Sequence, residues 1–319
     1  MLDILHKIFV GPFIEMSHAP DLLVQVLWEG FVSGTLYALI ALGFVLIYKA
    51  SSVFNFAQGI MVVFSALTLV GLIEMGLPAW LALLMTVGVM YVLAVSVERT
   101  ILLPLVNQSQ STMIMATIGL SSFLIGFGGF IFGGEPKSMP VALLGIPTGS
   151  MQFSVFNGHI NIQNLDLAAA VMALVMVTTL GIFFSKTRIG RALRAVADDH
   201  QAALSVGITL KQIWVIVWFT AGIVGLTTGI FWGARSDVSF SLQIIALKAL
   251  PVLILGGFTS IPGVFIGGLI IGIGEQLFEY YWGVQMGGGT QGWVAYMIAL
   301  LFLWVMPQGL FGEKIIERI

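Results

Sequence analysis

Long apolar stretches, separated by short polar connections, occupy most of the chain. A helix that crosses a membrane needs about 20 mostly apolar residues. The seventh stretch, 243–258, is short and contains Pro251, so it is either a full crossing or a broken or re-entrant segment. The pattern therefore predicts an all-α, multi-pass membrane protein with eight or nine transmembrane segments. The candidate stretches are 24–48, 56–76, 78–97, 112–133, 166–185, 211–233, 243–258, 261–280 and 292–306.

Two segments fall outside this pattern. Residues 1–21 contain too many polar residues and prolines to span a membrane, and we expect them to lie on its surface, leaving 22–319 as the transmembrane domain. The run MQFSVFNGHINI, by contrast, alternates apolar and polar residues. It predicts a small β-hairpin near 150–162 that turns at Asn157–Gly158, because Asn-Gly supplies the positive φ angles of a tight turn.

The longest polar stretch, 186–211 (KTRIGRALRAVADDHQAALSVGITLK), determines the predicted orientation. It carries five of the 13 basic residues of the chain. Lys and Arg are enriched in cytoplasmic loops. If 186–211 is cytoplasmic, alternation of the crossings places nine Lys and Arg residues inside and three outside. The sequence thus predicts a cytoplasmic loop at 186–211 and an extracytoplasmic hairpin.

Capping residues within this loop predict a short helix at about 199–206. Asp198 is a suitable N-cap with Gln201 three residues later, and Gly207 is a suitable residue to follow the helix. Two interpretations fit: a solvated connector, or a coupling helix that inserts into a groove on a cytoplasmic protein and transmits its motion. The residues of the candidate coupling helix are Asp198, Asp199, His200, Gln201, Ala202, Ala203 and Gly207.

Composition excludes several classes of protein. Of the 319 residues, 58% are hydrophobic and 9% are charged, whereas soluble domains have about a quarter of their residues charged. Without cysteine there are no disulfides or zinc–thiolate sites, and the sequence has no phosphate loop, metal-binding helix or nucleophile motif. We therefore expect no catalytic residue, metal or cofactor in this chain, and membrane lipid but no nucleic acid among its partners.

Lys248 is the most costly residue within an apolar stretch. A lysine at the centre of a membrane-spanning helix costs about 2.5–3.5 kcal/mol on insertion scales. It therefore requires a carboxylate, carbonyl groups or water, and Glu275 and Glu279 are the carboxylates at suitable depth. We expect either a structural ion pair or a contact between Lys248 and a substrate carboxylate.

Three uncharged polar residues, Asn55, Gln58 and Thr117, also interrupt apolar stretches. Their side chains either cap and pack helices or line a polar translocation pathway. The glycines Gly225, Gly229 and Gly233 recur every four residues, as do Gly263 and Gly267, and as do Gly268 and Gly272. This spacing lets neighbouring helix backbones approach closely. These glycines form either ordinary packing contacts or a seam that opens and closes.

Several motifs together resemble one family. GRALRAVADDHQAALSVGI is similar to the cytoplasmic loop of permeases from bacterial branched-chain amino acid ABC importers, the LivH family. The family's first-to-second span junction resembles LIYKASSVFNFAQG, although Ile60 stands where many members carry an acidic residue. Further resemblance lies in TIGLSSFLIGFGGFIFG, KALPVLILGGFTSIPGVFIGGLIIGIGE and PQGLFG. The resemblance covers nearly everything from about residue 24 onward.

The resemblance implies a permease subunit of a binding-protein-dependent importer in the bacterial inner membrane. It implies as partners a sister permease subunit or second copy, two cytoplasmic ATPase subunits that hold ATP and Mg²⁺, and an extracytoplasmic solute-binding protein. The implied solutes are branched-chain or other apolar amino acids, with urea, short amides or small organic acids as alternatives. A stand-alone secondary transporter or channel is the alternative of another class.

Overall fold

The computed structural model describes residues 10–106, 108–156, 158–198, 203, 205, 207 and 209–312. Each of the nine predicted apolar stretches coincides with a helix. These helices are α3 (Pro20–Ser51), α4 (Gln58–Glu74), α5 (Ala79–Val97), α6 (Gln110–Phe132), α7 (Asn164–Lys186), α10 (Leu210–Ser236), α11 (Ile245–Gly256), α12 (Ile261–Tyr281) and α13 (Gln291–Val305).

Six helices of the described chain are long and apolar enough to cross a membrane: α3, α5 with its extension Glu98–Leu102, α6, α7, α10 and α12. The other three, α4, α11 and α13, have 12 to 17 residues. A multi-pass membrane protein follows from these helices. Eight or nine full crossings stay a prediction.

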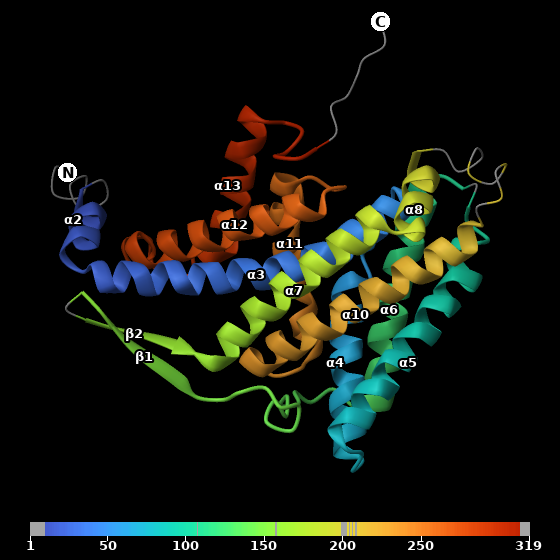
Figure 1. Cartoon of the computed structure of the whole chain (residues 1–319), viewed down its shortest axis with the longest axis horizontal. Helices are drawn as coiled ribbons and strands as arrows, with labels where there is room; N and C mark the ends of the chain where they lie inside the picture. The colour runs from blue at the N-terminus through green and yellow to red at the C-terminus, as the bar shows by residue number, and fades with distance from the viewer. Residues whose placement is uncertain are drawn as a thin grey trace, which may run out of the picture.

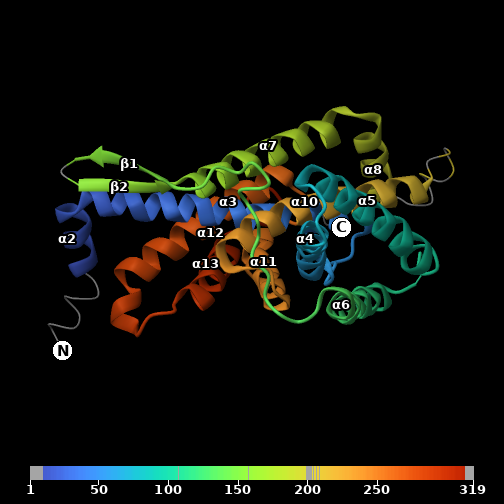
Figure 2. The same cartoon turned by 90° about the horizontal axis from the view of Figure 1, so that it is seen from below.

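Helix α3 is the central element of the fold (Figure 1). It has 32 residues and so spans about 48 Å. In its most apolar window, 94% of the residues are buried inside the protein, against 22–28% in α5, α6 and α7. Helix α7 and the hairpin lie on one side of α3, and α12 and α13 lie on the other (Figure 2). A helix that is apolar all round is one that other elements surround.

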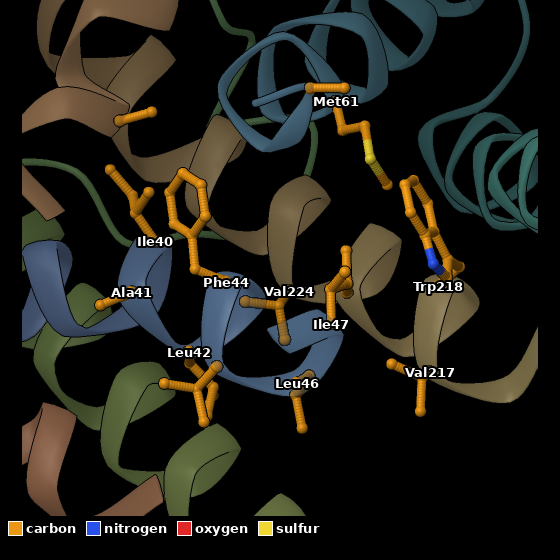
Figure 3. Close-up of a cluster of buried hydrophobic side chains, with 14 of the residues drawn as sticks. Ile40, Ala41, Leu42, Phe44, Leu46, Ile47, Met61, Val217, Trp218 and Val224 are labelled. Atoms are coloured by element: carbon orange, nitrogen blue, oxygen red, sulfur yellow. The ribbon is translucent and has the colours of Figure 1, made fainter. Parts of the chain in front are cut away.

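The core forms where α3, α4 and α10 meet. Figure 3 shows Phe44 of α3, Met61 of α4 and Trp218 of α10 within this cluster. All three side chains are at least 96% buried. A second indole, that of Trp214, donates from Nε1 to the Ala50 carbonyl at 3.3 Å, so the end of α10 is tied to the end of α3.

The predicted hairpin consists of strands β1 (Ser150–Val155) and β2 (Gly158–Gln163), which pair antiparallel. Val155 pairs with Gly158, so the loop is 156–157 rather than the predicted Asn157–Gly158. Phe156, at φ 54°, adopts the left-handed conformation, and Asn157 lies outside the described residues. The Asn-Gly rule located the turn but misplaced its register by one residue. The extracytoplasmic position of the hairpin stays a prediction.

The N-terminal part begins with α2 (Gly11–His18), which lies in the segment expected at the membrane surface. Helix α3 starts at Pro20, four residues before the predicted stretch at 24. Proline is favoured at the first position of a helix because its missing N–H has no intrahelical partner there. The apolar pattern therefore underestimated the length of this helix.

The seventh stretch is irregular, as its proline suggested. A 3₁₀ turn (Phe240–Ile244) runs directly into α11, and Pro251 lies inside that helix. Proline has no N–H to donate to the carbonyl four residues earlier, which here belongs to Leu247. Tyr296 of α13 supplies the missing donor, since its hydroxyl donates to the Leu247 carbonyl at 2.9 Å. A tertiary contact thus compensates for the broken helical hydrogen bond.

Candidate translocation site

Three polar side chains meet inside the helix bundle. Lys248 Nζ of α11 lies 2.6 Å from Glu275 Oε1 of α12 and 3.1 Å from the hydroxyl of Tyr37 on α3. The hydroxyl also lies 3.2 Å from Glu275 Oε1 and donates to it. Glu275 is thus the carboxylate partner of Lys248. We call these three residues the buried triad.

The buried triad leaves some hydrogen-bonding capacity unused. Glu275 is 1% exposed, and its second oxygen, Oε2, is buried without a hydrogen-bond partner. The Lys248 side chain remains 27% exposed. Trp232 of α10 stacks on the Tyr37 ring with centroids 5.8 Å apart. The triad therefore joins four helices, and the exposed part of the ammonium group remains available to a ligand.

Glu279, the other carboxylate considered for Lys248, has different partners. Its oxygens accept from the Thr290 hydroxyl and from the N–H groups of Gly289 and Gln291, the last two at 3.0 and 3.1 Å. Glu279 therefore holds the start of α13 against α12 and takes no part in the triad.

Asn55 and Thr117 stabilise the six-residue break between α3 and α4. Asn55 Oδ1 accepts from the Ala57 N–H at 3.0 Å, and Thr117 Oγ1 accepts from the Phe56 N–H at 3.2 Å. Buried backbone N–H groups need such partners. Both side chains therefore perform the capping and packing role that was one of their two interpretations, and a pathway role for them stays a prediction.

Gln58 is different from these two residues. It is fully buried; its Nε2 donates to the Ala221 carbonyl at 3.4 Å, while its Oε1 has no partner. An unused buried acceptor is uncommon and costly. Gln58 thus keeps a free polar atom where α4 meets α10. It lies apart from the buried triad, so the five pathway candidates do not form one cluster.

A largely apolar pocket of about 240 Å³ lies where the α3–α4 break faces the irregular seventh segment. Phe44, Phe54 and Phe56 line one wall, with the first two rings stacked at 4.6 Å between centroids. Irregular backbone at membrane depth occurs where protein buries it or where it lines a cavity. Ile60, which departs from the resembled family, also lines this pocket.

Most of the singled-out glycines sit at close backbone contacts. A Cβ at Gly229 would lie 2.7 Å from the Val62 carbonyl, and one at Gly263 would lie 2.1 Å from the Gly256 carbonyl. At Gly267 the Val252 carbonyl is equally limiting, at 2.8 Å. These are packing contacts. Any role in opening and closing a seam stays a prediction.

The other two glycines differ in kind. Gly233 faces the Val238 side chain at 2.5 Å, whereas a Cβ at Gly225 would make only ordinary contacts, at 3.6 Å. Sequence analysis missed the tightest seam of the fold, where Gly30 and Gly34 of α3 meet Gly268 and Gly272 of α12. Here a Cβ at Gly272 would lie 2.3 Å from a backbone nitrogen of α3. The four-residue spacing of Gly30 and Gly34 was the available signal.

The polar loop contains a helix that the capping pattern did not predict, α8 (Arg188–Asp198). Its residues Leu193 and Val196 are buried, and Arg194 Nη1 donates to the Phe184 carbonyl near the end of α7 at 2.9 Å. Asp198 is the last described residue of α8. The apolar residues of α8, three and four apart, were the missed signal.

Of the other candidate coupling-helix residues, Asp199, His200, Gln201 and Ala202 lie outside the described part of the chain. Ala203 is helical and 2% exposed, and Gly207 has a positive φ of 84°. The described loop lies at the opposite end of α3 from the hairpin (Figure 1). Opposite ends are what the predicted topology requires, while the side of the membrane stays a prediction.

Comparison with known proteins identifies the family. The family model described as "Branched-chain amino acid transport system / permease component" matches residues 26–306. The chain belongs to this permease family. The match begins within α3 and ends just after α13, so it includes the buried triad, the α3–α4 break and the polar loop.

Individual relatives agree over almost their full length. The permease is 28% identical over 314 residues to the high-affinity branched-chain amino acid transport system permease protein LivH of Salmonella typhimurium, covering 93% of this chain and 97% of the relative. It is 28% identical to BraD of Pseudomonas aeruginosa, with 93% and 98% covered. A probable LivH of Methanocaldococcus jannaschii is 26% identical, with 92% and 94% covered. The permease is therefore a multi-pass transport subunit that is not itself catalytic.

Proposed function

We propose that the chain is the transmembrane subunit of a binding-protein-dependent importer for branched-chain or other apolar amino acids in the bacterial inner membrane. The observation that carries this proposal is the family match over 26–306, because it includes both the membrane core and the polar loop. LivH of Salmonella typhimurium and BraD are named as high-affinity branched-chain amino acid permeases. Urea, short amides and small organic acids are the alternative solutes.

Energy for inward transport comes from partner proteins in this proposal. The sequence has no phosphate loop with which to hold ATP. Two cytoplasmic ATPase subunits bind ATP and Mg²⁺, a sister permease or second copy completes the pathway, and an extracytoplasmic binding protein delivers the solute. Family membership supports this assembly.

The polar loop is the proposed contact with the ATPases. Coupling requires an element that moves as a unit between two positions. Helix α8 is suited to this because Leu193 and Val196 are buried and Arg194 is bonded to the end of α7. A push on 198–207 would therefore pass through α8 into α7.

The absence of cysteine permits a direct test. We expect Asp199→Cys to cross-link to an ATPase subunit carrying single cysteines on its membrane-facing surface. The matched control is Glu135→Cys, an exposed residue in the connection before the hairpin, which should give no product. Equal cross-linking at both positions, or none at Asp199→Cys, would contradict the coupling role.

Transport itself is tested in liposomes. We expect leucine uptake to require ATP, both ATPase subunits and the binding protein. Ala203→Arg is a poor uncoupling variant because Ala203 is buried, so Asp199→Lys is preferred and should lower the ATPase stimulation that accompanies uptake. Uptake by the chain alone, without ATP, would instead establish the stand-alone transporter.

A further inference from the structure

A second, strongly polar pocket lies at the hairpin end of α3. Its volume is about 490 Å³, within the range of small-molecule sites. Eight of its ten lining residues are polar, in a chain with only 9% charged residues. The residues used below are Gln25, Glu29, Ser33, Asn161, Arg235 and Gln276.

The sequence builds one wall of this pocket from a single helix face. Gln25, Glu29, Ser33 and Tyr37 of α3 are spaced four residues apart, and residues at this spacing lie on one face of a helix. Gln25 joins the wall to the hairpin, because its Oε1 accepts from the Asn161 N–H at 2.9 Å. The same face ends at Tyr37 of the buried triad. The pocket therefore lies one helical turn from the triad.

The charged groups of the pocket keep unused capacity. Arg235 directs both Nε and Nη2 at one oxygen of Asp166, at 3.2 and 2.5 Å, and its side chain is 26% exposed. A guanidinium has five N–H donors, so donors remain for a ligand.

Glu29 has an amide partner in Gln25, whose Nε2 lies 2.9 Å from Glu29 Oε1. Within the described chain it belongs to none of the three ion pairs. The pocket thus presents a carboxylate and a guanidinium, each able to accept an opposite charge.

We propose that this pocket is an entry site for the zwitterionic group of an α-amino acid. Arg235 binds the solute carboxylate and Glu29 binds the solute ammonium group. Charge-assisted hydrogen bonds of this kind are the stronger ones. A purely structural ion pair would need no cavity, because protein interiors are normally close-packed. The inference rests on the proposed function and adds to it a site outside the triad and the α3–α4 break.

Thiol labelling tests the site directly in the cysteine-free chain. Ser33→Cys places a thiol in the pocket wall, and a negatively charged methanethiosulfonate reagent should label it in the assembled complex without binding protein. We expect millimolar L-leucine to slow labelling at least threefold. Leucine methyl ester, which lacks the carboxylate, and 4-methyl-2-oxopentanoate, which lacks the ammonium group, should protect much less. Ser138→Cys, exposed outside the pocket, should be labelled without protection.

A second substitution tests the ammonium contact. In the Ser33→Cys background, Glu29→Gln should raise the half-protecting L-leucine concentration about tenfold, as expected for loss of one hydrogen bond to a charged group. The matched control Glu135→Gln should leave it unchanged. If Ser33→Cys does not assemble, Asn161→Cys reports on the same pocket.

Two outcomes separate this inference from the proposed function. ATP-dependent leucine uptake by the complex, with labelling that L-leucine does not slow or with equal protection by all three compounds, overturns the entry site alone. Absence of ATP-dependent uptake by the unmodified complex overturns the proposed function.

Discussion

Replacing Lys248 with methionine removes the cation of the buried triad and leaves Glu275 unpaired at 1% exposure. At a separation of 2.6 Å, two unit charges attract by about 6 kcal/mol at an effective dielectric constant of about 20. Desolvation of the two ions costs several kcal/mol each, so the pair contributes little net stability. The single variant nevertheless loses the attraction and keeps the cost of the buried carboxylate.

We therefore expect Lys248→Met to lower the free energy of unfolding by about 3–5 kcal/mol. Glu275→Gln should cost less, because the remaining ammonium group is 27% exposed and can reach water. The double variant Lys248→Met/Glu275→Gln should return to within about 1 kcal/mol of the unmodified protein, because it leaves no unpaired charge. Denaturant unfolding in mixed micelles measures all four proteins.

Transport in the same four proteins then separates the two interpretations of Lys248. If the pair is structural, uptake should recover in the double variant together with stability. If Lys248 binds the solute carboxylate, the double variant should be stable and inactive. A Lys248→Met protein as stable as the unmodified one would refute the reasoning itself, since it would mean that Glu275 needs no cation.

Three further substitutions test packing and buried polar groups, each by the midpoint of thermal unfolding. Gly272→Ala should cost several kcal/mol, because its Cβ would lie 2.3 Å from the α3 backbone, whereas Gly119→Ala, with nothing within 4 Å, should be neutral or stabilising; equal effects would contradict the seam. Tyr296→Phe should cost about 1–3 kcal/mol, since it leaves the Leu247 carbonyl without its donor, and no loss would mean that water replaces the hydroxyl. Glu98→Gln should stabilise the protein, because both oxygens of this fully buried carboxylate lack partners, and a loss of stability would indicate an unseen partner.

The sequence by itself determined the class, the positions of the helices and the family. In a membrane, backbone N–H and C=O groups must be satisfied within the segment, so a sufficiently long apolar stretch is a helix whatever surrounds it. This local rule accounts for the nine coincidences between apolar stretches and helices. It failed where the apolar signal stops short, at the start of α3, and where a helix is amphipathic and polar, at α8.

Only the tertiary structure decided which helix is central and which polar groups meet. Helices α3 and α5 have nearly equal mean hydropathy, 2.1 and 2.2, yet 94% of one window and 28% of the other are buried. Apolar residues suit a lipid-facing surface and a protein core equally well, because lipid is as apolar as the core.

The same reason governs the sites. Glu275 and Glu279 lie one turn apart on α12, and only the direction of each side chain shows that Glu275 pairs with Lys248. Tyr37 completes the triad from a helix 211 residues away in the chain, and such a contact leaves no periodicity in the sequence. Side-chain meetings between distant helices depend on how the helices pack, which the pattern of apolar residues does not encode.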